Sequence, residues 1–251
     1  MDYNLENKVA LVTGGSRGLG AAICRALGNS GAKVAVNYFS RMEEAKSVQE
    51  EIVQGGGIAE IFQGDVTKEV EVKKLCESVT TCFGPIDILV LNATLIHVHK
   101  PIEDLVWQDM VDHFEFFVKS PLLLAQQVLP SMKQRKQGRI INIGSEVFER
   151  GIPRFSHYVA AKGAQLGLTR SWANELGEYQ ITVNLVAPGW IPTEMHDNDP
   201  EEMKLDYAEN VPLKRMGAPS DIGEMVAFLA SDAAKFITGQ RMTVNGGNTM
   251  V

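Results

Sequence analysis

The stretch from Lys8 to Gly20 reads K-V-A-L-V-T-G-G-S-R-G-L-G and decides the fold. Its first five residues form a short apolar run, which is typical of a buried strand. The glycine-rich turn follows at once, and the pattern from Ala21 to Ser30 indicates a helix that ends at Gly31. A glycine turn between a strand and a helix is the setting in which such a turn can bind phosphate.

The turn itself reads T-G-x-x-x-G-x-G from Thr13 to Gly20, which differs from the commoner G-x-G-x-x-G. Glycines let backbone N–H groups approach a pyrophosphate, and the N-terminus of the following helix faces its negative charge. The other interpretation is a tight turn without a ligand. The strand-to-helix setting favours the phosphate site.

A second pattern lies further along the chain, where Tyr158 precedes Lys162 by four residues and Ser145 lies thirteen residues before Tyr158. Residues at i and i+4 share a helix face, so the phenol and the ammonium can enter one site. An ammonium there would lower the pKa of the phenol from about 10 toward neutral, as general acid–base catalysis requires. The Ser145 hydroxyl could hold a carbonyl oxygen or an alcohol. Such a trio also arises by chance, and its members would then be structural or surface residues.

Apolar runs of strand type alternate with helical patterns along the whole chain. Strands are expected at 8–12, 33–38, 58–63, 86–91, 139–144, 181–187 and 241–244, and helices at 21–30, 42–54, 68–83, 107–134, 155–179 and 220–231. Pro121 would kink the long helix. The alternation predicts an α/β fold in one Rossmann-type domain over residues 1–251, with a doubly wound parallel sheet of about seven strands and helices on both faces. The ligand crevice would lie at the carboxyl ends of the strands.

Seven segments at ordered spacing carry a resemblance to a known family, namely 13–20, 64–66, 92–93, 138–145, 158–162, 184–193 and 239–247. Over essentially its whole length the chain resembles the short-chain dehydrogenase/reductase family, and within it the beta-ketoacyl (3-oxoacyl-acyl-carrier-protein) reductase-like members. The resemblance implies that Ser145 orients the substrate oxygen and that Tyr158 transfers the proton. It implies that Lys162 lowers the pKa of the tyrosine and binds the nicotinamide ribose, while hydride passes between nicotinamide and carbon.

The second expected strand bears on which dinucleotide binds. An enzyme specific for NAD usually ends this strand with an acidic residue, where this chain has Tyr38. Arg17 and Arg41 can instead face a 2′-phosphate, with Ser40 adding a hydroxyl, so NADP is expected ahead of NAD. The alternative is that both arginines are solvated surface charges.

The resemblance extends the expected cofactor site to other strand ends. It implies that Asp65 and Val66 hold the adenine, that Asn92 and Ala93 line the ribose, and that residues 188–193 bind the nicotinamide amide. Asp65 could otherwise cap the helix that follows. The expected cofactor-binding residues are Gly14, Ser16, Arg17, Gly18, Leu19, Gly20, Tyr38, Ser40, Arg41, Asp65, Val66, Asn92, Ala93, Tyr158, Lys162, Pro188, Gly189, Ile191 and Thr193.

Two positions depart from the family pattern. The N-N-A-G of the family reads L-N-A-T here, so Thr94 replaces a glycine that passes near the cofactor. In the long helix, Phe117 replaces an asparagine that in the family helps to hold the water linking the lysine to solvent. The Phe117 carbonyl, Glu146 or His157 could substitute for it, although surface packing is the favoured interpretation of the last two.

Composition excludes several classes of function. The net charge of −7 and the lack of a basic run argue against nucleic-acid binding. No apolar run approaches about 18 residues, and Met1 to Asn7 are polar, so a cytoplasmic protein without membrane contact is expected. Cys24, Cys76 and Cys82 lack the spacing of a disulfide framework or a zinc site. His97 and His99 are interpreted as loop residues, so no metal is expected.

These patterns predict an NADP-dependent oxidoreductase that reduces a ketone, with a 3-oxoacyl thioester as one candidate, to a secondary alcohol. The alternatives are an NAD-dependent alcohol dehydrogenase and a nucleotide-binding protein with little catalysis because of Phe117. Residues 190–213 form a candidate substrate lid. The family is commonly tetrameric, so a homotetramer or homodimer is expected, and the apolar residues at 114–124 would be an interface or a core face.

Overall fold

The computed structural model describes residues 3–197 and 199–250. Its strands are β1 (Val9–Val12), β2 (Lys33–Tyr38), β3 (Ile58–Gln63), β4 (Ile88–Leu91), β5 (Gly138–Ile143), β6 (Ile181–Pro188) and β7 (Arg241–Val244). Its α-helices are α1 (Gly18–Asn29), α2 (Met42–Gln54), α3 (Glu69–Phe83), α4 (Trp107–Phe114), α5 (Ser120–Arg135), α6 (Val147–Arg150), α7 (Ser156–Leu176), α8 (Glu201–Asn210) and α9 (Pro219–Ala230). A π-helical segment, η2 (Glu115–Lys119), joins α4 to α5. Short 3-10 turns are η1 (Ile102–Asp104), η3 (Gly177–Tyr179), η4 (Glu194–His196) and η5 (Asp232–Ala234).

The strands form one sheet in the order β3-β2-β1-β4-β5-β6-β7. Every neighbouring pair is parallel, with Val12 of β1 opposite Val36 of β2 on one side and Val90 of β4 on the other. The strand order reverses direction between β1 and β4, and in such sheets ligands bind outside the carboxyl ends at this point. The predicted doubly wound parallel sheet is confirmed.

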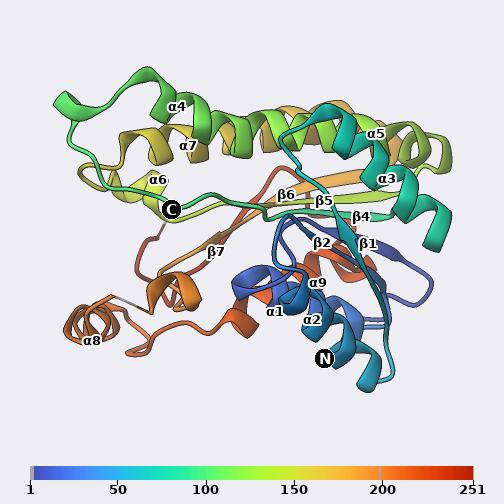
Figure 1. The fold of residues 1–251 in the computed structure, drawn as a ribbon, viewed down its shortest axis with the longest axis horizontal. Helices are drawn as coiled ribbons and strands as arrows, with labels where there is room; N and C mark the ends of the chain where they lie inside the picture. The colour runs from blue at the N-terminus through green and yellow to red at the C-terminus, as the bar shows by residue number, and fades with distance from the viewer. Residues whose placement is uncertain (1–2, 198, 251) are drawn as a thin grey trace.

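Helices cover both faces of the sheet (Figure 1). Helices α1, α2 and α9 lie on one face, while α3, α5 and α7 lie on the other, with α4 beside α7. Each layer has its own hydrophobic core. One core packs α1 and α9 on the sheet, and the other packs α3, α5 and α7 on it.

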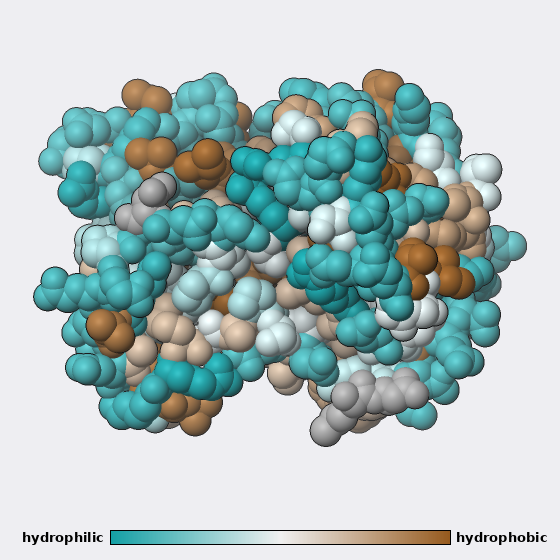
Figure 2. Space-filling view, turned by 60° about the horizontal axis from the view of Figure 1, so that its bottom comes forward, coloured by the Kyte–Doolittle hydropathy of each residue, from teal (hydrophilic) through white to brown (hydrophobic). Residues whose placement is uncertain are grey.

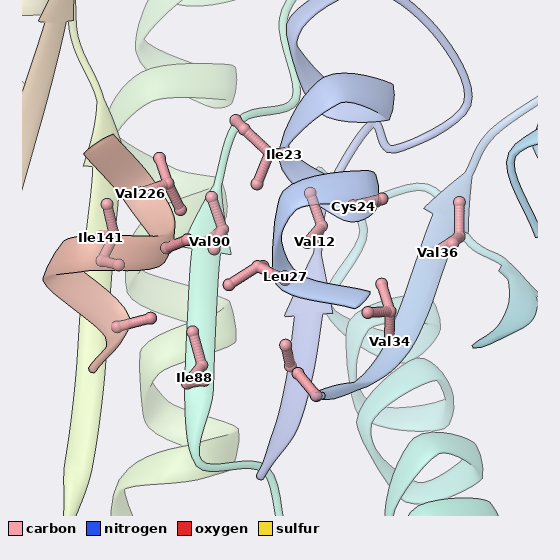
Figure 3. Packing of buried hydrophobic residues seen from close by; sticks show 14 of the residues in the cluster. Val12, Ile23, Cys24, Leu27, Val34, Val36, Ile88, Val90, Ile141 and Val226 are labelled. Atoms are coloured by element: carbon pink, nitrogen blue, oxygen red, sulfur yellow. The ribbon is translucent and has the colours of Figure 1, made fainter. Parts of the chain in front are cut away.

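The first core shows why these residues form these elements. Ile23 and Leu27, one turn apart on α1, point onto β1 and β4, where Val12 and Val90 are fully buried (Figure 3). Burying an aliphatic side chain of this size contributes about 1.5–3 kcal/mol, so β1 and β4 need apolar residues on both faces. Cys24 packs in the same core, where burial raises the pKa of its thiol. The prediction that Cys24 is a small apolar residue within a helix agrees with this position.

Two regions differ from expectation. The long helix is not simply kinked at Pro121, because η2 interrupts it and Pro121 lies in the first turn of α5. Proline lacks the N–H that would bond the Phe117 carbonyl four residues earlier, and its ring is tolerated at a helix start. Residues 190–213, where the sequence predicted no helix, contain the helix α8. Among the described residues, no helix is long and apolar enough to cross a bilayer.

Candidate active site

The glycine loop between β1 and α1 has the backbone that its sequence requires. Gly14 and Gly18 have φ values of +63° and +54°, a region that side chains disfavour. A side chain at Gly20 would clash with the Gly14 carbonyl oxygen. Ser16 and Leu19 are half-buried in this loop and its helix start. The loop therefore brings backbone N–H groups to the N-terminus of α1, as an anion site needs.

Two asparagines brace this loop. Asn37 of β2 accepts a hydrogen bond from Gly14 N at 3.2 Å and donates to the Gly64 carbonyl at 3.1 Å. Asn92 Nδ2 donates to the carbonyls of Thr13 and Gly14 at 2.9 and 3.1 Å. Asn92 and Ala93 thus lie beside the loop, and the Asn92 amide supports it directly, while their place along the ribose stays a prediction. Sequence reasoning did not single out Asn37, whose amide lies buried at the end of an apolar strand.

The residues expected to bind a 2′-phosphate lie in the glycine loop and directly after β2. Arg41 donates to Glu44 Oε1 at 2.7 Å. That hydrogen bond lowers the pKa of Glu44, and the charge of Arg17 contributes, so both guanidinium groups act on one carboxylate. Ser40 is exposed next to them, whereas Tyr38 is only 4% exposed and belongs to the core.

Asp65 forms a turn of its own. Its Oδ1 accepts from Thr67 N at 2.9 Å and from Thr67 Oγ1 at 2.7 Å. The alternative that Asp65 caps helix α3 is wrong, because Lys68 is the residue at that position and it makes no side-chain cap. Val66 is buried beside it.

The segment after β6 approaches the glycine loop. Gly18 lies against Thr193, since a Cβ built on Gly18 would be 3.4 Å from Thr193 Cγ2. Pro188 and Ile191 are buried, and Gly189 N donates to the Val244 carbonyl at 3.0 Å. The ends of β1, β4 and β6 therefore converge on one place, as the parallel topology predicts.

Ser145, Tyr158 and Lys162 come together at the end of β5 and the start of α7. The Ser145 hydroxyl lies beside the phenol of Tyr158, close enough to lower its pKa. Lys162 Nζ lies 5.6 Å from the centre of the Tyr158 ring. It donates to the Ile143 carbonyl at 2.7 Å and to Gln165 Oε1 at 3.2 Å.

Burial dominates the electrostatics of this trio. Burial raises the pKa of Tyr158 to about 12, and the hydrogen bond with Ser145 offsets this only in part. Burial also holds the pKa of Lys162 well below its usual value, which favours the neutral amine over the ammonium. Lys162 donates to Ile143 and Gln165 and not to the phenol here, so the expectation that it lowers the pKa of Tyr158 toward neutral stays a prediction.

The pKa of Tyr158 is measurable by titration. A raised folded-state pKa favours the neutral phenol, so its contribution to stability is present below pH 10 and is lost as pH rises toward 12. We expect the tyrosinate absorbance of the wild type minus that of Tyr158→Phe to show no ionisation between pH 6 and about 10. A difference signal with a midpoint near pH 7–8 would contradict this.

Phe117 lies against Lys162, next to the trio. It is 1% exposed, and its ring centre lies 3.8 Å from Lys162 Nζ. Gln165 is a polar partner of the lysine here, and its Nε2 donates to Asn142 Oδ1 at 3.3 Å. Neither Glu146 nor His157 takes that role. Both are nevertheless buried, so the interpretation as surface packing is wrong.

Glu146 is the centre of a separate network beside Ser145. Its carboxylate accepts from Asn248 at 2.8 Å, Asn245 at 2.9 Å and the Tyr207 hydroxyl at 3.1 Å. The same hydroxyl accepts from Trp190 N at 2.9 Å. The network fastens α8 and residues 245–248 to the loop of Ser145.

A ring cluster surrounds Tyr158 on the side of α4. The centroid of His97 is 4.0 Å from that of Tyr158, with Phe155 at 5.0 Å and His113 at 6.1 Å. Sequence reasoning treated His97 only as a loop residue and did not single out His113. A cavity of about 510 Å³ opens elsewhere, along residues 189–191, 212–217 and 243–247, and the trio does not line it.

Comparison with known proteins agrees with this geometry. A family model described as Enoyl-(Acyl carrier protein) reductase matches residues 14–249. The chain belongs to the short-chain dehydrogenase/reductase family. It is therefore an oxidoreductase, as predicted, and the family assignment from sequence is confirmed.

Two curated relatives of this family illustrate the similarity. The chain is 42% identical to a 3-oxoacyl-[acyl-carrier-protein] reductase FabG of Staphylococcus epidermidis, over 97% of this chain and all of that one. It is 39% identical to a 3-oxoacyl-[acyl-carrier-protein] reductase of Synechocystis, over 98% of both chains.

Two solved structures are also similar. A blue fluorescent protein from a metagenomic library, in complex with NADPH, has a TM-score of 0.90 and 37% identity, and the match covers 98% of this chain and all of that one. A 7 alpha-hydroxysteroid dehydrogenase, complexed with NADH and 7-oxo glycochenodeoxycholic acid, has a TM-score of 0.93 and 34% identity over 98% of this chain and 96% of that one.

Proposed function

We propose that this short-chain dehydrogenase/reductase reduces a ketone to a secondary alcohol with NADPH. The observation that carries the proposal is the Ser145 hydroxyl beside the phenol of Tyr158 at the carboxyl edge of the sheet. The glycine loop lies at the same edge, where parallel sheets bind dinucleotides.

Each chain residue then has a role in the reaction. Ser145 holds the carbonyl oxygen, and Tyr158 donates its proton to the alkoxide that forms. Lys162 binds the ribose and lies on the same face of α7 as Tyr158. Bound NADPH supplies the hydride, and the protein supplies position and charge.

The high pKa of Tyr158 favours the reductive direction. A phenol with a pKa of about 12 is protonated at neutral pH, so it is ready to donate a proton. Alcohol oxidation needs the phenolate instead, which would form only in alkaline solution. The alternative of an NAD-dependent alcohol dehydrogenase is therefore less favoured.

The residues present fit a dinucleotide with a 2′-phosphate. A side chain at Gly20 would clash within the Gly14–Gly20 turn, and Arg17 and Arg41 both act on the Glu44 carboxylate, so a 2′-phosphate there would meet both guanidinium groups. A FabG relative is named as an acyl-carrier-protein reductase and a similar structure contains NADPH. These matches support NADP ahead of NAD and a 3-oxoacyl thioester as a candidate substrate. Asp65 and residues 188–193 would hold the adenine and the nicotinamide.

Substitutions at the expected 2′-phosphate site should change the affinity for NADPH and not that for NADH. Arg41→Ala should weaken NADPH binding about tenfold, because it removes a charge-assisted bond, and leave NADH binding little changed. Glu44→Gln should strengthen NADPH binding, because it frees Arg41 from its ion pair. Fluorescence titration measures both, with Arg170→Ala on α7 as a control. Equal effects on both nucleotides would contradict the assignment.

Residues 190–213 would act as a lid over the substrate, and Asn198 within it lies outside the described residues. Tyr207 of α8 supports this, since it reaches Glu146 beside Ser145.

A homotetramer or homodimer is part of the proposal. Phe117 and Leu124 are core residues of one chain, so an interface would use the more exposed Leu122 and its half-buried neighbours. Figure 2 shows exposed apolar residues in small separate groups on one face.

The proposal is tested by titrating the protein with NADPH and NADH and then adding acetoacetyl thioester and a panel of ketones. We expect tighter binding of NADPH, followed by its oxidation. Binding without oxidation of any ketone would instead favour a nucleotide-binding protein with little catalysis. This second candidate function is supported by the Phe117 ring, which covers the Lys162 amine.

A further inference from the structure

Both positions that depart from the family pattern lie against His97. Thr94 Oγ1 is 3.2 Å from His97 Nε2. The Phe117 ring centre is 6.0 Å from that of His97. On its other side His97 Nδ1 is 3.3 Å from His113 Nε2, and its ring centroid is 4.0 Å from that of Tyr158, with the two rings tilted by 34°. Thr94 and Phe117 therefore both belong to the group of side chains around His97, next to the phenol of Tyr158.

One backbone carbonyl fixes the protons of both imidazoles. The Asp109 carbonyl can only accept, so His113 Nδ1–H donates to it at 2.8 Å. The Nε2 atom of neutral His113 is then an acceptor, and His97 Nδ1–H donates to it. This leaves a lone pair on His97 Nε2. Burial lowers the pKa of both rings, that of His97 to about 3, so both are neutral at pH 7.

The loop that carries His97 is held on several sides. Lys100 N donates to the Arg154 carbonyl at 2.8 Å, and Lys100 Nζ pairs with Asp109 at 2.5 Å. His157 donates to the Val98 carbonyl from its Nε2, since its Nδ1 has no partner among the described residues. The position of His97 beside Tyr158 is therefore preorganised.

The His97 Nε2 lone pair lies beside the exposed Thr94, whose hydroxyl is its partner in this structure. The Thr94 hydroxyl has one proton and two acceptors, His97 Nε2 at 3.2 Å and the Leu95 carbonyl at 3.3 Å. A donor on a substrate can thus take the His97 lone pair while Thr94 turns to Leu95. No hydrogen bond is lost in this exchange.

A proton relay is the other role that a histidine pair could have. Its outer end, His113 Nδ1–H, is bonded to a carbonyl that has no proton to give. The pair is therefore arranged to hold a lone pair in place and not to conduct protons from solvent.

We propose that His97 is a specificity-determining residue whose Nε2 accepts a hydrogen bond from a hydroxyl or amide on a carbon next to the substrate carbonyl. His113 is the positioning residue that fixes its tautomer. The inference rests on the proposed function and narrows the substrate to ketones that carry such a donor.

The test compares 2-hydroxyacetophenone with 2-methoxyacetophenone, which resemble each other electronically but differ in the donor. We expect the wild type to prefer the hydroxy ketone in kcat/KM. In His97→Phe, which keeps a ring but removes the acceptor, the ratio should fall about tenfold, the worth of one hydrogen bond. Dividing the ratio of the variant by that of the wild type cancels the intrinsic reactivity of the two ketones.

His99→Phe is the matched control, since it makes the same change two residues away, where His99 stacks on Phe155. Its ratio should equal that of the wild type. His113→Phe should lower the ratio while His97 itself remains, which a merely structural role of His113 would not do. A ratio that stays the same in His97→Phe would overturn the inference and leave the reductase intact. If the wild type reduces no ketone at all, the proposed function fails first.

A second readout needs no turnover. Long-range proton–nitrogen NMR at pH 7, with His97→Phe used for assignment, reports the tautomer of His97. We expect the neutral form with the proton on Nδ1. A proton on Nε2 would overturn the inference.

Discussion

Tyr158→Phe should abolish ketone reduction and leave NADPH binding largely intact. The phenyl ring keeps the packing against His97 and Phe155, at 4.0 and 5.0 Å, so the site should hold its shape. What is lost is the proton that the alkoxide needs, and a positioned general acid contributes about 10²- to 10⁴-fold. Steady-state kcat and fluorescence titration measure the two effects separately.

Tyr179→Phe is the control for this change, since Tyr179 lies in η3, just beyond the far end of α7, under Lys133. It should retain wild-type kcat. Full activity in Tyr158→Phe would contradict the role given to the phenol.

Glu146→Gln should produce the largest loss of stability among the site residues. The side chain is 3% exposed and accepts from Asn245, Asn248 and Tyr207. The amide keeps the volume but turns an NH₂ group toward donors, which leaves buried donors unpaired. We expect the free energy of unfolding to fall by about 3 kcal/mol and Tm to fall on the order of 10 °C.

The matched control is Glu202→Gln on the exposed surface of α8, for which we expect a change within about 0.5 kcal/mol. Denaturant unfolding compares the two variants. Equal stability of Glu146→Gln and the wild type would show that the network does not hold the loop of Ser145 to α8.

Much of the fold could be predicted because its central strands are buried on both faces. Strands such as β1 and β4 then read as continuous apolar runs between glycine turns and helices. Helix α8 could not be predicted in this way, since it has no buried residue and no apolar stripe. The interruption at η2 was also missed, because a proline shows where hydrogen bonds are lost but not how the helix adjusts.

The site was predictable as far as strand ends and helix spacing allow. Parallel topology places the ends of β1, β4, β5 and β6 together, and the family motifs name residues there. Gln165 was missed although it lies three residues after Lys162, on the same face of α7. The sequence pattern that could have identified Gln165 is a polar stripe along α7, which continues to Thr169. The Thr169 hydroxyl accepts a hydrogen bond from the buried Asn142 at 3.0 Å.

Other features of the site depend on distances that a sequence does not contain. The pKa of Tyr158 follows from burial and from where the Lys162 amine points. Glu146 meets partners that lie 61 to 102 residues further along the chain. The role of His97 depends on His113, on another element, and on one carbonyl of α4.

The central claim is that hydride passes from the nicotinamide directly to the substrate carbon beside Tyr158. The most direct measurement is reduction of acetoacetyl thioester with NADPH deuterated at the transferable position of C4, followed by NMR of the product. We expect deuterium on the carbon that bears the new hydroxyl, with Tyr158→Phe giving no product. Product without deuterium at that carbon, or no product with any ketone, would contradict the account.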